Sequence, residues 1–472
     1  MVAGDQSQPV DCLVLGGGPG GYVAAVRAAQ CGRSVTLVEG DRLGGVCLNE
    51  GCIPGKALME VAGLRSRVAG MAAAGLGGAA PPVDLAAFQA WKRSLVARLA
   101  GEIEELLHGS GVRVVRGWAR FAGRTRVGVR TGEESTQYFD FKDVVIATGS
   151  RPAPLPSLPF DGDRVCDPGQ ALDWTDLPTS MVVFGGDPVG LELASAFTLL
   201  GSDVALVDPG DRLIPAMDAD LSRAAAEAAR QAGVRLLLRS RPRGMDGATV
   251  VIDTPDGELR LPAARIVVSA GRLPRLDDLD LAAARIRPPV DRFEVDDRLR
   301  VERHVFAVGD VTAGPQLAHR ASAQGRVAGE VLGGRASAMD AVVVPEVVFA
   351  QPPLASAGLT AEGARAGGLE VAVAHVPFGV LGRGLISGAE RGWARVVYEL
   401  DTGRLLGAHV AGGAAGELIA AAVVAIEMGA TLEDLALIVQ AHPTFAEAIS
   451  GAAEAGLGRP LHTVSGGSRA TL

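Results

Sequence analysis

The sequence predicts an α/β protein with two Rossmann-like nucleotide-binding domains and a C-terminal α+β domain. Two segments, about 170 residues apart, each consist of a strand, a glycine-rich turn, a helix and a second strand. A third region, from Pro345 onward, mixes short strands with helices. The length of 472 residues fits about three domains, since one domain usually takes roughly 100 to 200 residues.

The composition agrees with this fold class and argues against several kinds of partner. The chain is 48% hydrophobic and 21% charged, and its 63 glycines indicate many tight turns. Its formal net charge is −9 and it has no long basic run, so neither nucleic acid nor an anionic membrane surface is an expected partner. No apolar run is long enough to span a membrane, and the first residues are polar and acidic, unlike a secretory signal. We therefore expect a cytoplasmic protein.

The first strand–turn–helix–strand unit runs from Asp11 to Glu39. Its turn carries Gly16, Gly18 and Gly21, which is the spacing of a dinucleotide-binding loop. Glycines there allow a pyrophosphate to approach the backbone N–H groups at the helix N-terminus. Glu39 ends the second strand, where a carboxylate accepts hydrogen bonds from ribose hydroxyls. A plain strand-to-helix turn is the alternative, but the flanking strands and the acidic residue favour a dinucleotide site.

The second unit has the same layout with one departure. Gly185 and Gly190 are kept and Asp208 ends the second strand, but Asp187 stands where the middle glycine is expected. Two unit charges about 4 Å apart repel by roughly 1 kcal/mol in water and about 4 kcal/mol at an intermediate dielectric, which predicts weaker pyrophosphate binding. Asp208 would repel a 2′-phosphate, so remaining affinity should favour NAD over NADP. Two interpretations stay open: a weakened NAD site, or a retained domain that binds no nucleotide.

Cys47 and Cys52 follow the first unit, in the segment GGVCLNEGCIPGKAL. Both are expected near the start of a helix, whose dipole favours the thiolate needed for disulfide exchange. A zinc site would need further cysteines or histidines at ligand spacing, and none follows nearby, so no metal site is expected. We interpret Cys12, Cys31 and Cys166 as buried structural residues rather than redox groups.

The segment GGVCLNEGCIPGK resembles the redox segment of the pyridine nucleotide–disulfide oxidoreductase family, and is most similar to its lipoamide branch. This resemblance covers nearly the whole chain. It implies FAD as the cofactor, Cys47 as the thiol that exchanges with the substrate, and Cys52 as the thiol next to the flavin. It also implies Lys56 beside the flavin, paired with Glu192. Gly55 departs from the serine usual in the family, which removes a hydroxyl but no atom of the electron path.

Further segments resemble the FAD-binding segments of the family. In VVIATGS and VFAVGD the resemblance implies contacts to FAD, with Asp310 holding the ribityl chain, and it implies that LAHRASAQG lies against the isoalloxazine ring. The implied FAD-binding residues are Gly16, Gly18, Pro19, Gly20, Gly21, Glu39, Gly45, Lys56, Ala147, Thr148, Gly149, Gly309, Asp310, Leu317, Ala318 and His319. The candidate NAD-binding residues are Gly185, Gly190, Asp208 and Gly271.

The C-terminal segment AHPTFAEA is similar to the catalytic dyad segment of the family. It implies His442 as the acid/base and Glu447 as the residue that orients it. Such chemistry is needed because a dithiol must lose a proton before it attacks a disulfide, and imidazole titrates near working pH. Family members supply this segment from the partner subunit, which implies a homodimer with shared active sites. The His442–Pro443 bond is a candidate cis peptide.

The expected domains follow from these segments. Residues 1–150 and 272–343 should form the FAD-binding domain, 151–271 the NAD-binding-like domain, and 344–472 the interface domain with a loose C-terminal tail. The leading hypothesis is a dithiol/disulfide oxidoreductase that passes electrons from a small thiol or lipoyl-like substrate through Cys47–Cys52 and FAD to NAD, within a multi-enzyme complex or alone. Two alternatives remain: an NAD-independent flavoprotein oxidase that acts on a specialised or carrier-bound thiol, motivated by Asp187, and a non-catalytic dimeric scaffold.

Overall fold

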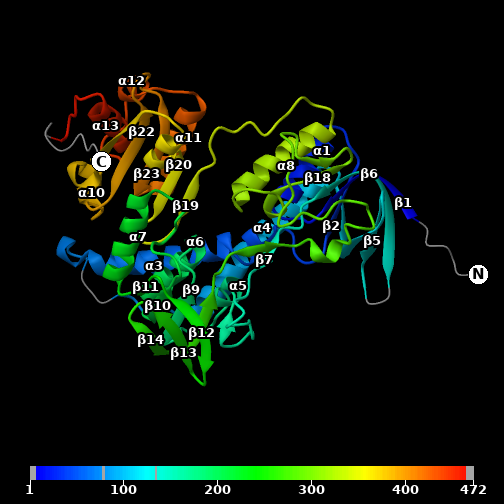
Figure 1. The fold of residues 1–472 in the computed structure, drawn as a ribbon, viewed down its shortest axis with the longest axis horizontal. Coiled ribbons are helices and arrows are strands. Elements are labelled where there is room, and N and C mark those ends of the chain that lie inside the picture. Colours follow the sequence, from blue (N-terminus) through cyan, green and yellow to red (C-terminus); the bar gives the residue numbers. More distant parts are fainter. Residues whose placement is uncertain (1–6, 77–79, 133–134, 464–472) are drawn as a thin grey trace, which may run out of the picture.

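The computed structural model describes residues 7–76, 80–132 and 135–463 (Figure 1). Most of the expected C-terminal tail therefore lies outside the described residues. Within the described part, no helix combines the length and the apolar character that a membrane crossing requires.

The first lobe is built on a mainly parallel sheet with strand order β17-β18-β6-β1-β2-β3, extended by β4 and β5. Its strands alternate with helices, as the first βαβ unit predicts, and β1 pairs in parallel with both β2 and β6. The elements of this lobe are β1 (Ser7–Leu15), α1 (Pro19–Gln30), β2 (Val35–Glu39), α2 (Gly45–Asn49), α3 (Cys52–Gly70), α4 (Leu85–Gly109), β3 (Arg113–Arg116), β4 (Trp118–Gly123), β5 (Arg126–Arg130), β6 (Thr136–Ile146), β17 (Arg300–Glu302), β18 (Val305–Ala307) and α8 (Ala318–Leu332).

Two distant stretches of chain complete this lobe together. Helix α8 packs against α1 (Figure 1), and the two helices approach closely because glycines face each other. A Cβ atom on Gly325 would lie 2.3 Å from the carbonyl oxygen of Gly20, and one on Gly329 would lie 2.8 Å from that of Ala24. Any larger side chain at these positions would force the helices apart.

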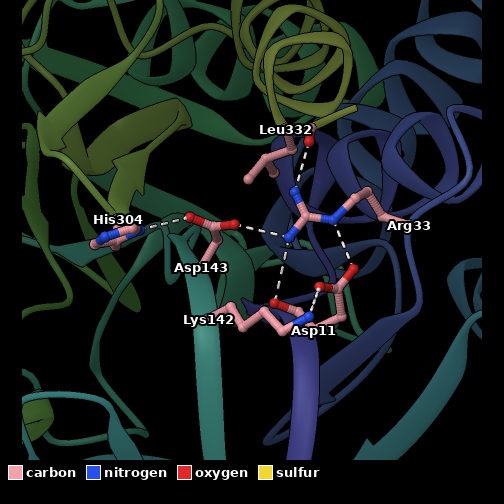
Figure 2. A network of polar contacts seen from close by, with 6 residues as sticks. All are labelled: Asp11, Arg33, Lys142, Asp143, His304 and Leu332. Carbon is pink, nitrogen blue, oxygen red and sulfur yellow. Dashed lines mark hydrogen bonds and ion pairs between the residues drawn. The ribbon is translucent and has the colours of Figure 1, made fainter. Parts of the chain in front are cut away.

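A charged network also joins these two stretches (Figure 2). Arg33, between α1 and β2, donates hydrogen bonds to Asp11 on β1 at 2.6 Å and to Asp143 on β6 at 2.7 Å. Its third contact is the carbonyl oxygen of Leu332, the last residue of α8, at 2.5 Å. Lys142 pairs with Asp11 and His304 with Asp143 at the edges of the network. Because these aspartates are mostly buried, the single guanidinium compensates two carboxylates that water solvates poorly.

The second lobe repeats the parallel arrangement with strand order β11-β10-β9-β15-β8, beside an antiparallel sheet of β12, β13 and β14. Its buried strands are rich in valine and isoleucine, as expected for strands covered on both faces. The elements are β8 (Val165–Cys166), α5 (Pro168–Ala171), β9 (Ser180–Phe184), α6 (Pro188–Leu200), β10 (Asp203–Val207), α7 (Ala219–Ala232), β11 (Arg235–Leu237), β12 (Arg241–Asp246), β13 (Thr249–Thr254), β14 (Gly257–Pro262) and β15 (Arg265–Val268).

The chain leaves and re-enters the first lobe through two short antiparallel strands, β7 (Ser150–Pro152) and β16 (Arg272–Pro274). This pair lies at the two expected crossings between the FAD-binding and NAD-binding-like domains, after residues 150 and 271. The expected boundaries at residues 150, 271 and 343 stay predictions.

The third lobe is an antiparallel sheet with strand order β19-β20-β23-β22-β21, covered by helices that include α11 and α13. A long connection from α8 leads into it (Figure 1). Its elements are β19 (Glu346–Val348), β20 (Leu354–Gly358), α9 (Ala361–Ala366), β21 (Val371–Pro377), α10 (Gly382–Ile386), β22 (Trp393–Glu399), β23 (Leu405–Ala411), α11 (Ala415–Glu427), α12 (Leu432–Leu437) and α13 (Glu447–Gly456).

Candidate active site

The glycine-rich turn of the first lobe opens into a cavity of about 330 Å³. Gly16 has φ +105°, and a Cβ there would lie 2.3 Å from the carbonyl oxygen of Ala147, so the turn requires glycine. Gly18 forms the N-cap of α1, and no side chain caps this helix. The free N–H groups and positive dipole end of α1 therefore face a cavity large enough to receive a phosphate ligand.

Most residues that the family resemblance implies for FAD line this cavity. They are Gly16, Gly18, Pro19, Gly20, Glu39, Gly45, Lys56, Ala147, Thr148, Gly149, Gly309, Asp310 and Ala318, together with Cys47, Cys52 and Glu192. An uncapped helix N-terminus, two carboxylates and a dithiol are the groups that a flavin dinucleotide with a redox partner requires, so the residues present fit FAD.

Three implied FAD residues do not line the cavity. Gly21 lies behind the turn, where a Cβ would be only 1.9 Å from the carbonyl oxygen of Gly16, so its role is close helix–strand packing. Leu317 is the N-cap of α8, and its neighbours Gln316 and Ala318 line the cavity wall in its place. His319 points elsewhere: its Nε2 lies 2.8 Å from the carbonyl oxygen of Pro345.

Other lining residues were missed by the sequence analysis. Arg272 reaches the cavity from β16, where its Nε donates to Ser150 Oγ at 2.7 Å, and Ser150 Oγ donates to Asp310 Oδ2 at 2.5 Å. Arg275 and Trp118 also line the wall. Arg272 and Arg275 both belong to the segment SAGRLPR, which follows the second lobe, and both line this first cavity.

The dithiol lies directly against the FAD turn. Gly45 has φ +59°, and a Cβ there would lie 2.8 Å from the Cα of Gly18, so glycine lets α2 approach the turn. Cys47 lies within α2, whereas Cys52 is the first residue of α3, after a break at Gly51. The sequence suggested one helix start for both cysteines; the structure divides them between two helices.

The two cysteine thiols are free and share a hydrogen bond. This bond from Cys47, with a further contribution from the Lys56 ammonium, lowers the pKa of Cys52 to about 7. The same contact and burial raise the pKa of Cys47. In the reduced pair, negative charge is therefore favoured on Cys52 over Cys47. Of the remaining cysteines, Cys12 is fully buried and burial raises its pKa to about 12, which agrees with a structural role.

Lys56 and Glu192 form a buried ion pair beside the dithiol. Lys56 Nζ lies 2.8 Å and 3.1 Å from the two carboxylate oxygens, and the N–H of Phe349 donates to Glu192 Oε1 at 2.9 Å. Lys56 Nζ also lies 4.7 Å from the centre of the Phe349 ring. Glu192 comes from α6, so this pair joins the second lobe to the first. A Cβ on Gly55 would lie 4.0 Å from Glu192 Oε2, so nothing in the structure explains the glycine there.

In the second glycine-rich turn, unlike the first, a side chain caps the N-terminus of the following helix. Asp187 is the N-cap of α6, and its Oδ1 accepts hydrogen bonds from the N–H of Gly190 at 2.7 Å and from Ser269 Oγ at 2.8 Å. Burial raises the pKa of Asp187 to about 6. Asp208 accepts from the N–H groups of Gly186 at 2.6 Å and Gly210 at 2.7 Å. Gly271 has φ +89° and lies on the approach to β16.

The C-terminal dyad has the expected internal geometry. His442 Nδ1 lies 2.8 Å from Glu447 Oε1, and Glu447 Oε2 accepts from the N–H of Thr444 at 2.8 Å. Although burial opposes it, these hydrogen bonds hold the pKa of Glu447 below its ordinary value. The His442–Pro443 peptide is cis, as predicted. His442 is 73% exposed and does not line the dithiol cavity, so a single chain does not bring the dyad to the dithiol.

Comparison with known proteins identifies the class to which this fold and site belong. Residues 10–325 match the family described as pyridine nucleotide-disulphide oxidoreductase, and residues 344–453 match its dimerisation domain. The chain belongs to the pyridine nucleotide-disulphide oxidoreductase family. This membership confirms the predicted fold class and the predicted class of enzyme, an FAD-dependent oxidoreductase acting on sulfur groups.

Individual members of the family show which enzymes this chain is similar to. The chain is 40% identical to the dihydrolipoyl dehydrogenase of Halobacterium salinarum, over 98% of this chain and 100% of that protein. It is 38% identical to the dihydrolipoyl dehydrogenase of Geobacillus stearothermophilus, with the same coverage. Among solved structures, LpdA from Mycobacterium tuberculosis matches with a TM-score of 0.87 and 28% identity, covering 94% of this chain and 99% of that one. The flavoprotein disulfide reductase RclA from Escherichia coli matches with a TM-score of 0.83 and 25% identity, with the same coverage.

Proposed function

We propose that this protein oxidises a dithiol of the dihydrolipoyl kind, with FAD as its resident cofactor and NAD as the electron acceptor. The observation that carries this proposal is the Cys47–Cys52 pair at the cavity wall, with a lysine that favours the Cys52 thiolate. The full-length similarity to dihydrolipoyl dehydrogenases supports the choice of substrate.

In the proposed reaction, the oxidised enzyme carries a Cys47–Cys52 disulfide. His442 of one subunit takes a proton from a substrate thiol, and the resulting thiolate attacks Cys47 Sγ. A mixed disulfide forms and the Cys47–Cys52 bond breaks, which releases Cys52 as a thiolate. The second substrate thiol then attacks the substrate sulfur atom of the mixed disulfide, and its proton passes to Cys47, which leaves as a thiol while the first proton stays on His442. The substrate thereby becomes a disulfide, and its two electrons stay on the enzyme dithiol.

Each residue has a separate task in this scheme. Glu447 orients the His442 ring and stabilises its protonated form. Lys56 favours the negative charge on Cys52, and Glu192 holds Lys56 in place. FAD, when bound by the cavity residues, supplies the two-electron carrier between the dithiol and the nicotinamide nucleotide.

We propose further that the active unit is a homodimer in which each subunit completes the other's site. The exposure of His442 supports this, because a dyad that serves the dithiol has to reach it from another chain. Large apolar side chains also stand exposed on the third lobe, as an interface requires. They include Ile386, Val424, Met428, Leu437, Ile438 and Val439.

Steady-state assay tests this function directly. Purified protein given dihydrolipoamide and NAD⁺ should produce NADH, and the Cys47→Ser variant should lose this activity. Cys12→Ser is a suitable control, because Cys12 is buried in β1, away from the cavity. Equal turnover by wild type and Cys47→Ser would refute the proposal, as would no turnover by either protein in its FAD-loaded form.

The sequence relatives from Halobacterium salinarum and Geobacillus stearothermophilus do not favour the alternative oxidase, since both are dihydrolipoyl dehydrogenases. Anaerobic titration with NADH separates the two: rapid bleaching of the flavin agrees with nucleotide use. A scaffold role would leave the partner complex unaffected when both cysteines and His442 are replaced. Membership of a multi-enzyme complex and a cytoplasmic location stay predictions, which co-purification and cell fractionation test.

A further inference from the structure

The two glycine-rich turns are nearly identical in backbone. Gly16 and Gly185, which begin them, have φ values of +105° and +115°. At the third glycine position, a Cβ on Gly190 would lie 2.0 Å from the carbonyl oxygen of Gly185. The first turn shows the same restriction at Gly21. The second lobe therefore keeps the complete frame of a dinucleotide-binding turn.

The turns differ in what fills the middle position. Gly18 has φ −72° and ψ −176°, and Asp187 has φ −73° and ψ 171°, so any residue can adopt this conformation without strain. A Cβ on Gly18 would have the Cα of Gly45, at 3.8 Å, as its nearest atom, so glycine there leaves room for a ligand and is required neither by the backbone angles nor by the neighbouring chain. In the first turn the space opens to the cavity, whereas in the second a carboxylate occupies the helix N-terminus.

This carboxylate is held in place from two sides. The Gly190 N–H at 2.7 Å is one of the groups that a bound phosphate would use, and Ser269 Oγ at 2.8 Å comes from the end of β15. The other charged groups that act on Asp187 are Asp208 and Glu192, both negative. An incoming pyrophosphate therefore meets an occupied helix N-terminus and further negative charge.

We infer that Asp187 is a built-in anion that takes the N-terminus of α6 in place of the nucleotide pyrophosphate, and so sets a low affinity of this chain for nicotinamide dinucleotides. The inference rests on the proposed function in taking NAD as the nucleotide that this lobe receives. Asp187 is then the residue that limits electron transfer to NAD, because the residues of the dithiol and of the FAD cavity are present.

Direct binding measurements test this inference on FAD-loaded protein. The probe is NAD⁺, titrated calorimetrically into wild type, Asp187→Gly and Asp187→Asn. Removal of charge and side chain in Asp187→Gly should tighten binding by about fivefold to a thousandfold, the range that roughly 1 to 4 kcal/mol of repulsion corresponds to. Asp187→Asn should tighten binding by a smaller factor, because the amide keeps the volume and loses the charge.

The control is Asp84→Gly, which removes the aspartate N-cap of α4, a helix that is not part of the second turn. It should leave NAD⁺ binding unchanged, although it removes an aspartate N-cap from a helix as Asp187→Gly does. If Asp187→Asn binds NAD⁺ no more tightly than wild type, the inference is wrong, and this holds even if Asp187→Gly does not fold. Wild-type affinity equal to that of Asp187→Gly would also overturn it.

The proposed function can fail independently of this result. Anaerobic bleaching of the bound flavin by dihydrolipoamide does not involve the second turn, so all variants should show it equally. Loss of bleaching in every protein, wild type included, would count against the proposed function and leave the binding comparison valid.

Discussion

Replacing Lys56 by methionine tests how the ion pair beside the dithiol works. Glu192 is 6% exposed and would keep only the Phe349 N–H as a hydrogen-bond donor. Breaking a buried pair costs about 3–5 kcal/mol, but the Lys56 side chain is 34% exposed, so we expect a loss of about 1–3 kcal/mol in unfolding free energy. Most of this loss should come from the uncompensated carboxylate.

The double variant Lys56→Met/Glu192→Gln separates that cost from the effect on the thiol. A neutral amide still accepts from Phe349 and needs no cation, so the double variant should recover most of the stability that Lys56→Met loses. The thiol should respond differently. Lys56 lowers and Glu192 raises the pKa of Cys52, so Lys56→Met should move it above 7 and Glu192→Gln should move it below 7.

Two assays check these expectations. Urea unfolding of the FAD-loaded protein, at fixed protein concentration, gives the stability differences. Ultraviolet thiolate absorbance of the reduced protein against pH, as a difference from the matching Cys52→Ser variant, gives the Cys52 titration. Shifts of the Cys52 pKa in the same direction for both single variants would refute the electrostatic reasoning. Equal stability of Lys56→Met and wild type would refute the assignment of a buried ion pair.

Three further predictions concern other parts of the molecule. Glu447→Gln should lower kcat/KM for dithiol oxidation by about 10²-fold or more, because His442 loses its anionic partner. Stopped-flow measurement of flavin reduction checks this, and a rate without such slowing would contradict the proposed role of Glu447 in the dyad. Because the pKa of Asp187 is raised in the folded protein, its protonated form stabilises the fold below about pH 4, and this contribution is lost as the pH rises through about 6. Asp187→Asn should therefore gain up to about 3 kcal/mol in unfolding free energy over wild type between pH 4 and pH 7, as measured by urea unfolding. Arg33→Met should cost about 1–3 kcal/mol, since it leaves Asp11 with only Lys142 and Asp143 with only His304 as a side-chain partner, whereas Arg98→Met, at an exposed helical pair, should cost under about 0.5 kcal/mol; similar losses would contradict the network's role.

Local patterns were enough to predict much of the site. The first glycine-rich turn follows from residue spacing, whereas the cysteine pair and the cis bond at His442–Pro443 lie in short segments that resemble the family, so local sequence carries the information in each case. Asp187 was predicted to repel a phosphate, but its capping of α6 was missed. Aspartate is among the preferred N-cap residues, so a signal for this was present.

Other contacts could not be predicted because the fold creates them. Arg272 reaches Ser150 across 122 residues of sequence only because β16 pairs with β7. His319 lies in a segment that resembles an FAD contact, yet its ring turns to Pro345 in the next lobe. The exposure of His442 in one chain is likewise a property of the assembled lobes rather than of AHPTFAEA.

Because α1 packs against α8, the first lobe can be completed only late in the synthesis of the chain. Gly20 leaves the ribosome roughly 300 residues before Gly325, which at 5–20 residues per second is a delay of about 15 to 60 s. Throughout that time the first sheet lacks β18 and α8, and the FAD cavity lacks Gly309, Asp310 and Ala318. The second lobe is fully translated within this interval. Cofactor loading therefore has to follow translation of the middle of the chain, and a nascent chain stalled before Gly309 cannot yet form the cavity that receives FAD.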